Sequence, residues 1–442
     1  PSGSSSLSRS AGMFANFNYS WDNRYLIDLT GRIDGSSNFA SKQRSAPFWS
    51  AGVRWNIYNE KFMKTHGWFE NLAVRANIGT VGNQNFQLSQ IMTLYNFLKM
   101  YDGVMGAEIM SIANPELKWQ TTLNRNIGLE FSLLQGLVNL DFNYYSNITK
   151  NNLTDIAILP STGFSTYKAN MGKVRNQGYE FSLSITPIKK NGWIVNAFVN
   201  GAHNKNKLLN ISDALRDYNE VIKENQTAHL NYAGYTQLER IFLFEEGQSL
   251  NSIFAVRSMG IDPGTGQEIF VTADGVQTFQ WNAADQVVVG NTEPTLKGYF
   301  GLNVDYKRWS FGANFQYSFG ADRYNKTLYE KIEGGNFAQN ADRRALTQRW
   351  TKPGDVAKYR GYGNTSQLKP TSRFVQKDDF LSMTSARLSY TLNANDLQAL
   401  GISLLKFTLS TNDLFYVSTI KQERGLSYPF ARTFYFSLQA NF

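Results

Sequence analysis

Along many segments of this 442-residue chain, side chains alternate between apolar and polar residues. From 309 to 319 the odd positions hold Trp, Phe, Ala, Phe, Tyr and Phe, and the even positions hold Ser, Gly, Asn, Gln and Ser. The same alternation runs through 127–133, 138–144 and 433–442. Because successive side chains of a strand point to opposite faces, this period predicts long β-strands with one apolar and one polar face.

Two architectures shield one face of such strands, a soluble β-sandwich and a membrane-spanning β-barrel. The alternating segments come close to the roughly 9–11 residues that a tilted membrane strand needs. Their polar positions hold mainly Ser, Gly, Asn, Gln and Thr, with few of the Lys and Glu residues expected on a solvated face. Both features favour the barrel.

The connections between these segments alternate between short and long. Short ones fall at Trp21–Asn23, Gln135–Gly136, Ile188–Gly192 and Lys307–Arg308, with two somewhat longer ones at Tyr58–Asn71 and Asn393–Gly401. Long, polar ones fall at Asp34–Pro47, Val81–Trp119, Asn147–Asn170, Lys205–Pro294, Ala321–Asp379 and Asn412–Ala431. Short periplasmic turns and long extracellular loops are typical of outer-membrane barrels. About 13 strands fit between them, an odd number that puts the C-terminus in the periplasm if the chain enters from an extracellular loop.

Composition agrees with a barrel. Aromatic residues make up 14% of the chain, and such residues favour strands and gather at membrane interfaces. No stretch approaches the roughly 18 uninterrupted apolar residues of a membrane helix. The net charge of +9 has three explanations: anionic lipid headgroups, an anionic substrate or, most simply, ordinary surface charge.

The residues give no support for catalysis. The chain has no cysteine, which excludes a thiol nucleophile, and its three histidines, His66, His203 and His229, lie far apart in sequence. It lacks a phosphate-binding Gly-rich motif. Asp262–Glu268 is rich in oxygen atoms and could hold calcium, but it lacks EF-hand spacing, so a turn stabilised by Asp262 is the expectation. We therefore expect no enzyme, no metal site, no cofactor and no nucleic-acid partner.

Several segments resemble the SusC/RagA-like family of TonB-dependent outer-membrane transporters. They are Arg32–Phe39, Leu72–Gln84, Asn114–Trp119, Asn170–Glu180, Gly247–Leu250, Gly260–Gln267 and Asn412–Phe415. Gln120 departs from the pattern, because the family commonly has Glu there. The ordered series spans nearly the entire chain.

The resemblance implies an all-β fold, a transmembrane antiparallel barrel of roughly 22 strands. Residues 1–442 would be its C-terminal portion, with about 13 of the strands, and the plug and first strands would be absent. It also implies TonB-energised import of oligosaccharides or peptides across the bacterial outer membrane, with a SusD-like surface lipoprotein as partner. The alternative is a non-transporting SusC-like barrel that serves as a scaffold in an outer-membrane assembly or secretion complex.

An open sheet would leave unpaired backbone groups in lipid. We therefore expect the first strand (Gly12–Ser20) and the last strand (Thr433–Phe442) to pair with barrel strands outside this sequence. The final apolar residues resemble the C-terminal assembly signal of outer-membrane barrels; they are Phe434, Phe436, Leu438 and Phe442.

The connection 205–294 is too long to be a passive link. A second candidate contact region, 336–364, lies in the other long extracellular loop, 321–379. Candidate substrate-binding residues are Tyr232, Tyr235, Phe242 and Trp281 in the first, and Arg343, Arg344 and Trp350 in the second. The alternative is that the aromatic residues of the first loop, which also include Tyr218, Phe244 and Phe254, pack its own core. Ile253–Arg257 and Val287–Val289 are predicted to form a small sheet above the barrel, and Asn176–Gly178 a bulge.

Overall fold

The structure is a computed structural model. It describes residues 9–442 except 38–43, 64–67, 84–92, 112–113, 115–116, 158–162, 165, 171, 225–242, 336–341, 365–367, 394–400 and 422–430. No helix in the described residues is both long enough and apolar enough to cross a membrane.

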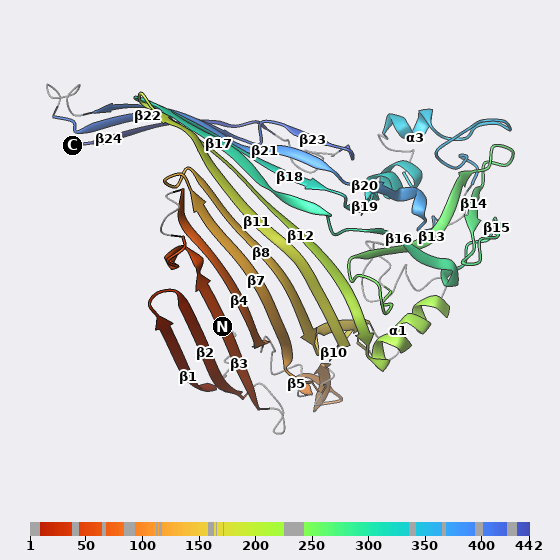
Figure 1. The fold of residues 1–442 in the computed structure, drawn as a ribbon. Helices are drawn as coiled ribbons and strands as arrows, with labels where there is room; N and C mark the ends of the chain where they lie inside the picture. The colour runs from red at the N-terminus through yellow and green to blue at the C-terminus, as the bar shows by residue number, and fades with distance from the viewer. Residues whose placement is uncertain are drawn as a thin grey trace.

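Thirteen strands follow one another in a single antiparallel sheet, the main sheet. In order they are β1 (Ser10–Trp21), β2 (Tyr25–Ser36), β3 (Ser45–Asn56), β4 (Phe69–Asn83), β7 (Gln120–Leu133), β8 (Val138–Lys150), β11 (Gly172–Lys190), β12 (Trp193–Ile211), β17 (Leu296–Tyr306), β18 (Trp309–Phe319), β21 (Phe380–Asn393), β22 (Leu404–Asn412) and β24 (Phe434–Asn441). A short strand, β23 (Tyr416–Ser418), pairs with β21 outside this order. The predicted antiparallel barrel sheet and its strand count are confirmed, and Figure 1 shows how the sheet curves from β1 to β24.

Tight turns join neighbouring strands at one end of the sheet, which we call the short-turn end. Trp21 pairs with Tyr25, Lys190 with Trp193, and Tyr306 with Trp309. At the second of these turns Asn191 and Gly192 have φ values of 55° and 79°. Two consecutive positive φ values are the requirement of a type I′ hairpin turn, which explains the Asn-Gly pair.

The two faces of the sheet differ as the alternation predicts. On the apolar face Phe300 stacks on Phe315 with ring centroids 4.8 Å apart, and further along Leu409 lies opposite Phe436. On the polar face Asn206 donates to the Asn176 side chain over 2.8 Å. The apolar face continues from strand to strand across the whole sheet, since the register keeps every apolar row on the same side.

The strand order ends at β1 and β24, which do not pair with each other in the described residues. Every residue of β1 and of β24 is exposed. Of the proposed C-terminal signal, Phe436 and Leu438 lie opposite Leu409 and Phe407 of β22. That these two edges pair with strands outside this sequence stays a prediction.

The bulge predicted at Asn176–Gly178 is wrong. The register of β11 against β12 runs without interruption from Val174 to Ile185, with shifts only beyond those residues. Gly178 is required for a different reason, because a Cβ atom there would lie 1.9 Å from the carbonyl oxygen of His203. The glycine lets two backbones approach closely.

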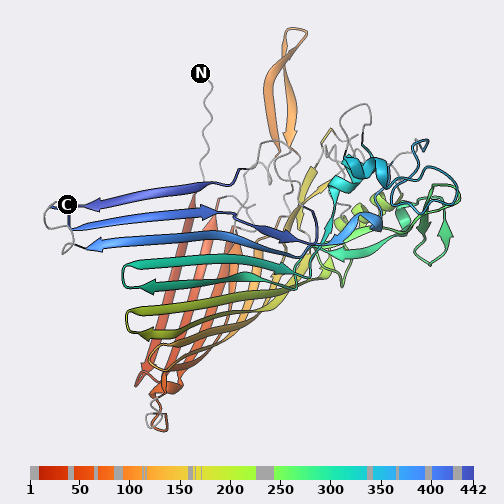
Figure 2. The ribbon, with the colours of Figure 1, turned by 90° about the horizontal axis from the view of Figure 1, so that it is seen from above.

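Strands extend further into the predicted loops than hydrophobicity indicated. β12 continues past Lys205 to Ile211, and β8 continues to Lys150. The regular alternation stops in these extensions before the pairing does, because Leu208 and Leu209 of β12 are adjacent and Lys150 of β8 falls at an apolar-face position. The loop after β4 contains a hairpin of β5 (Leu94–Tyr101) and β6 (Val104–Ser111), which Figure 2 shows projecting from the sheet.

Candidate functional site

The two longest connections fold together beside the sheet, at the end opposite the tight turns (Figure 1). The first holds helix α1 (Asp213–Glu224) and a four-stranded sheet of β13 (Ser252–Ile261), β14 (Glu268–Val271), β15 (Gln277–Thr278) and β16 (Gln286–Asn291). The second holds β19 (Asp322–Tyr324), a π-helix (Thr327–Glu333), α3 (Arg343–Thr347) and β20 (Val375–Lys377). We call residues 252–291 and 322–378 the loop module. Phe254 lies opposite Val288, which confirms the predicted small sheet.

Backbone and side-chain contacts join the two connections into one unit. Val256 forms a parallel bridge with Thr371, and the Ser258 amide donates to Ser372 Oγ over 3.0 Å. Trp350 Nε1 donates to the Pro263 carbonyl over 2.9 Å. Segments about a hundred residues apart in the sequence thus share one structure.

The loop module has an apolar core of its own. It consists of Leu328, Tyr329, Ile332, Ala345, Tyr359 and Phe374. The Tyr329 and Phe374 rings meet edge to face with centroids 5.2 Å apart. Burying a ring such as Phe374 stabilises the module by about 1.5–3 kcal/mol. In the first connection, Tyr218, Phe244 and Phe254 pack in two further apolar clusters, so for these three residues the loop-core alternative is confirmed.

Charged side chains in the module interior link the two connections. Arg373 donates from Nη2 and Nε to the carboxylate of Glu268, over 2.9 and 3.1 Å. Its Nη1 donates to Glu333 over 2.9 Å, and Arg360 Nε donates to the other oxygen of Glu333 over 2.8 Å. The Glu333 side chain is fully buried. Two arginines therefore balance two carboxylates, which offsets the cost of burying each charge alone.

Arg349 has a structural place in this interior. The residue is 7% exposed, and its guanidinium donates to the carbonyl oxygens of Ile332, Glu333, Ala345 and Arg360. These carbonyls belong to separate segments of the second connection, so Arg349 holds that connection in shape.

The pKa of Glu333 reflects the ion pairs. Burial raises the pKa of this carboxyl group, but the charges and hydrogen bonds of Arg373 and Arg360 outweigh burial and hold the pKa below its ordinary value of 4.5. A carboxyl group with a lowered folded pKa contributes stability above its unfolded pKa. That contribution is lost as the pH falls through the folded pKa.

We therefore expect acid to loosen the loop module before the main sheet. Lowering the pH from about 6 to about 3 should raise hydrogen exchange at amides of β13 near Val256, after correction for the intrinsic rate, while amides of β17 stay protected. The Glu333→Gln variant lacks the titrating group and should show a smaller acid response. Equal acid responses in the unmodified protein and the variant would show that Glu333 does not cause the acid response.

The predicted substrate-binding residues fall into three groups. Trp281 and Trp350 are half-buried, and both bond across the module: Trp281 Nε1 donates to the Pro370 carbonyl over 3.3 Å. Arg344 pairs with Asp342 over 2.7 Å, whereas Arg343 is exposed. The remaining three lie outside the described residues; they are Tyr232, Tyr235 and Phe242. The module thus brings Trp281, Trp350 and both arginines into one unit, and their contact with substrate stays a prediction.

A second charged cluster, which the alternation did not indicate, lies on the polar face near the short-turn end. Glu130 of β7 accepts from Arg54 of β3 over 2.8 and 3.2 Å and also pairs with Arg75 of β4. Arg75 Nη2 reaches Asp141 of β8 over 3.2 Å and Asn143 over 2.8 Å. The polar face is therefore not uncharged, and opposite charges at polar positions of neighbouring strands were the signal for it.

The remaining polar features are structural. Asp262 accepts from the amides of Gly264 and Thr265 and from the Thr265 hydroxyl, which confirms the predicted turn. The Thr265 hydroxyl is the main cause of the lowered pKa of Asp262. His203 Nδ1 lies 2.6 Å from the Thr295 carbonyl oxygen. Within the described residues, no three His, Asp or Glu side chains are placed to hold a metal ion.

Comparison with known proteins finds consistent relatives. The family model "TonB dependent receptor-like, beta-barrel" matches residues 2–236. TonB-dependent receptor P39 of Formosa agariphila is 28% identical, a match covering 92% of this chain and 42% of the relative. TonB-dependent receptor SusC of Bacteroides thetaiotaomicron is 27% identical, over 74% of this chain and 33% of that protein. The solved RagAB peptide transporter superposes with a TM-score of 0.79 and 25% identity, over 93% of this chain and 44% of that one. The chain thus spans less than half the length of these relatives.

Proposed function

Since this chain belongs to the TonB-dependent receptor β-barrel family and resembles its SusC/RagA-like members, we propose that it forms part of an energised importer in the bacterial outer membrane. The cargo is an oligosaccharide or a peptide, too large for passive pores. The importer draws energy from TonB through parts outside this sequence and works with a SusD-like surface lipoprotein. Its long loops face the cell exterior and its C-terminus the periplasm.

The observation that supports the proposal is the position of the loop module. It is folded, and it lies at the end of the main sheet opposite the short-turn end, which we call the long-loop end. The main sheet is the barrel wall, and its polar face is the inner one. A wall with polar side chains and balanced ion pairs offers hydrogen-bonding groups to a hydrated solute. The module adds aromatic surface, from Trp281 and Trp350, and an exposed cation, Arg343. Half-exposed aromatic rings suit sugar faces or peptide side chains.

Deletion of the gene tests the function. Growth should fail on the one glycan or peptide source that the protein imports and remain normal on simple sugars. If growth is unaffected on every such source and the protein co-purifies with assembly or secretion components, it is a scaffold instead.

A single substitution tests the loop module as the binding surface. In the full-length protein, Arg343→Ala should weaken binding of the imported compound about fivefold, since one charged hydrogen bond is worth roughly 1 kcal/mol at an exposed site. Titration of the purified protein with the compound measures this. Lys190→Ala, which removes an exposed cation at the short-turn end, should bind like the unmodified protein. Equal binding by both variants would remove Arg343 from the site.

A further inference from the structure

Toward the long-loop end, the apolar face of the sheet reaches an aromatic row on β8, β11 and β12. Tyr144 lies opposite Tyr179, and Tyr179 lies opposite His203. The Tyr179 ring stacks on His203 with centroids 5.1 Å apart. Beyond this row the same face carries six cations, which we call the basic belt: Arg125, Lys150, Lys173, Arg175, Lys205 and Lys207.

The register shows that the belt is on the apolar face. The register between β8 and β11 has no shift from Lys173 to Ile185. Arg175 and Tyr179 are four residues apart on β11, so their side chains lie on the same face. The side chain of Asn176 points the other way, since Asn206 donates to it on the polar face. The cations therefore continue the outward surface of the wall.

Within the described residues, the belt has no anionic partner. Lys150 lies directly opposite Lys173, and Arg175 directly opposite Lys207. Like charges in such cross-strand positions repel and destabilise a sheet. In the part of the chain that the structure describes, none of the six side chains forms an ion pair or a hydrogen bond, and Arg175 Nε is buried without an acceptor. An anion from outside the chain would offset this repulsion.

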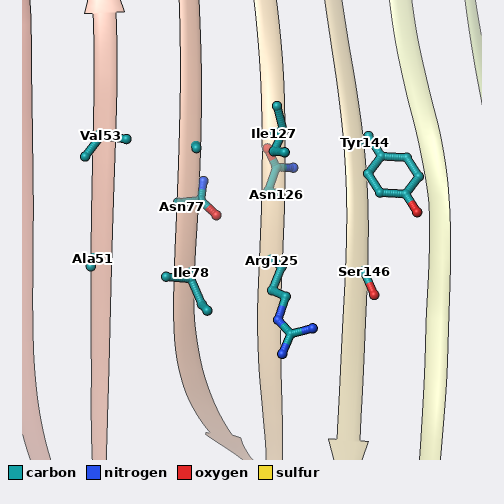
Figure 3. Close-up of a pocket in the computed structure, with 10 residues that line it drawn as sticks. Ala51, Val53, Asn77, Ile78, Arg125, Asn126, Ile127, Tyr144 and Ser146 are labelled. Carbon is teal, nitrogen blue, oxygen red and sulfur yellow. The ribbon is translucent and has the colours of Figure 1, made fainter.

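An apolar groove of about 440 Å³ adjoins the belt. It crosses β3, β4, β7 and β8, and its floor is low because Ala51 and Ala76 carry only methyl groups. Ile127 and Tyr144 line it further along, and Arg125 lies at the end nearer the belt. Figure 3 shows the Arg125 side chain extending along β7 away from Ile127.

The height of Arg125 fits a lipid headgroup. A rise of roughly 3.3 Å per residue at a tilt of roughly 45° places it about 19 Å from Leu133 across the membrane. The apolar band of such barrels is about 25 Å tall. The long Arg125 side chain can therefore reach the polar rim, whereas an unpaired guanidinium left among acyl chains is costly.

We propose that the basic belt and the groove bind one phosphate-bearing, acylated lipid of the outer leaflet. Its phosphate pairs with the cations, and one acyl chain lies over Ala51 and Ala76. A free phosphate would leave the groove empty, and a neutral lipid would leave the like-charge pairs uncompensated. The inference rests on the sheet spanning the membrane and not on import.

Native mass spectrometry of the full-length protein tests the proposal, with diphosphoryl lipid A as the probe and phosphatidylcholine and inorganic phosphate as comparisons. Lipid A should remain bound, and the two comparison compounds should not. Arg175→Gln/Lys205→Gln should weaken lipid A binding about tenfold, since each cation near a membrane surface contributes a severalfold effect. Lys189→Gln/Lys190→Gln removes two charges at the opposite end of the same hairpin and should bind lipid A normally.

The groove is tested without changing charge. Ala76→Phe fills it and should weaken lipid A binding while leaving the belt intact. Three outcomes would overturn the proposal. The belt variant and its control could retain lipid A equally, or the unmodified protein could retain phosphatidylcholine as well as it retains lipid A. The belt variant could also lose a co-purifying protein and not lipid A. Growth on the imported nutrient is scored separately, so failure of the lipid site does not bear on import.

Discussion

Replacing Arg373 with methionine should release the loop module from its folded state while the main sheet stays intact. The substitution preserves most of the side-chain volume but leaves Glu268 without its two guanidinium hydrogen bonds and Glu333 with only Arg360. Breaking a buried ion pair by removing one partner costs about 3–5 kcal/mol. Hydrogen exchange should show β13 and residues 372–377 losing protection together.

Two further variants separate charge from packing. Arg216→Met breaks ion pairs of a half-exposed arginine with Asp213 and Glu246, and it should cost less than about 1 kcal/mol. In the Arg373→Met protein, adding Glu268→Gln and Glu333→Gln should restore part of the protection, because the stranded charges are gone. If Arg373→Met and Arg216→Met perturb exchange equally, the interior network is not what joins the loops.

Replacing Gly178 with valine should destabilise the centre of the sheet. The new Cβ atom would meet the His203 carbonyl oxygen at 1.9 Å and the Tyr145 hydroxyl at 2.9 Å, so β11 and β12 must separate locally. Overpacking of this kind costs about 1–3 kcal/mol, and more where backbone atoms have to move. The folded fraction on heating, followed by the slower gel migration of the unfolded full-length protein, measures the loss.

Gly31→Val is the matched control. Gly31 also lies inside a strand, β2, but a Cβ atom there would have nothing within 4 Å. That variant should unfold at the temperature of the unmodified protein, or slightly higher, since valine favours strands. A similar loss of stability in both variants would show that glycine flexibility, and not close backbone approach, explains Gly178.

The strands were predictable because the two-residue alternation of apolar and polar side chains indicates where each strand lies. Segments such as Trp309–Phe319 coincide with observed strand boundaries, and the tight turns contain residues that tolerate positive φ. The period fails in the part of β12 after Lys205, because the adjacent residues Leu208 and Leu209 break the alternation although the pairing with β11 continues to Ile211.

The loop module was predictable only in part. Its small sheet was visible as two apolar runs, 253–257 and 287–289, and the Asp262 turn as a Pro-Gly-containing segment. The pairing of Arg373 with Glu268 joins residues that are far apart in sequence. Sequence separation of that size hides which charges meet. On the polar face, opposite charges at polar positions indicated a cluster but not that Glu130 meets both Arg54 and Arg75.

The bridge between Val256 and Thr371 limits how the two long loops can move relative to each other. Two separate loops would sample positions independently, each hinged on its own pair of strands. Because the bridge and the ion pairs join the two loops, they move as one rigid body. This body can rotate only where the chain enters and leaves it, beside β12, β17, β18 and β21. A compound that presses on either loop therefore displaces both, and the load is shared among four strands of the wall.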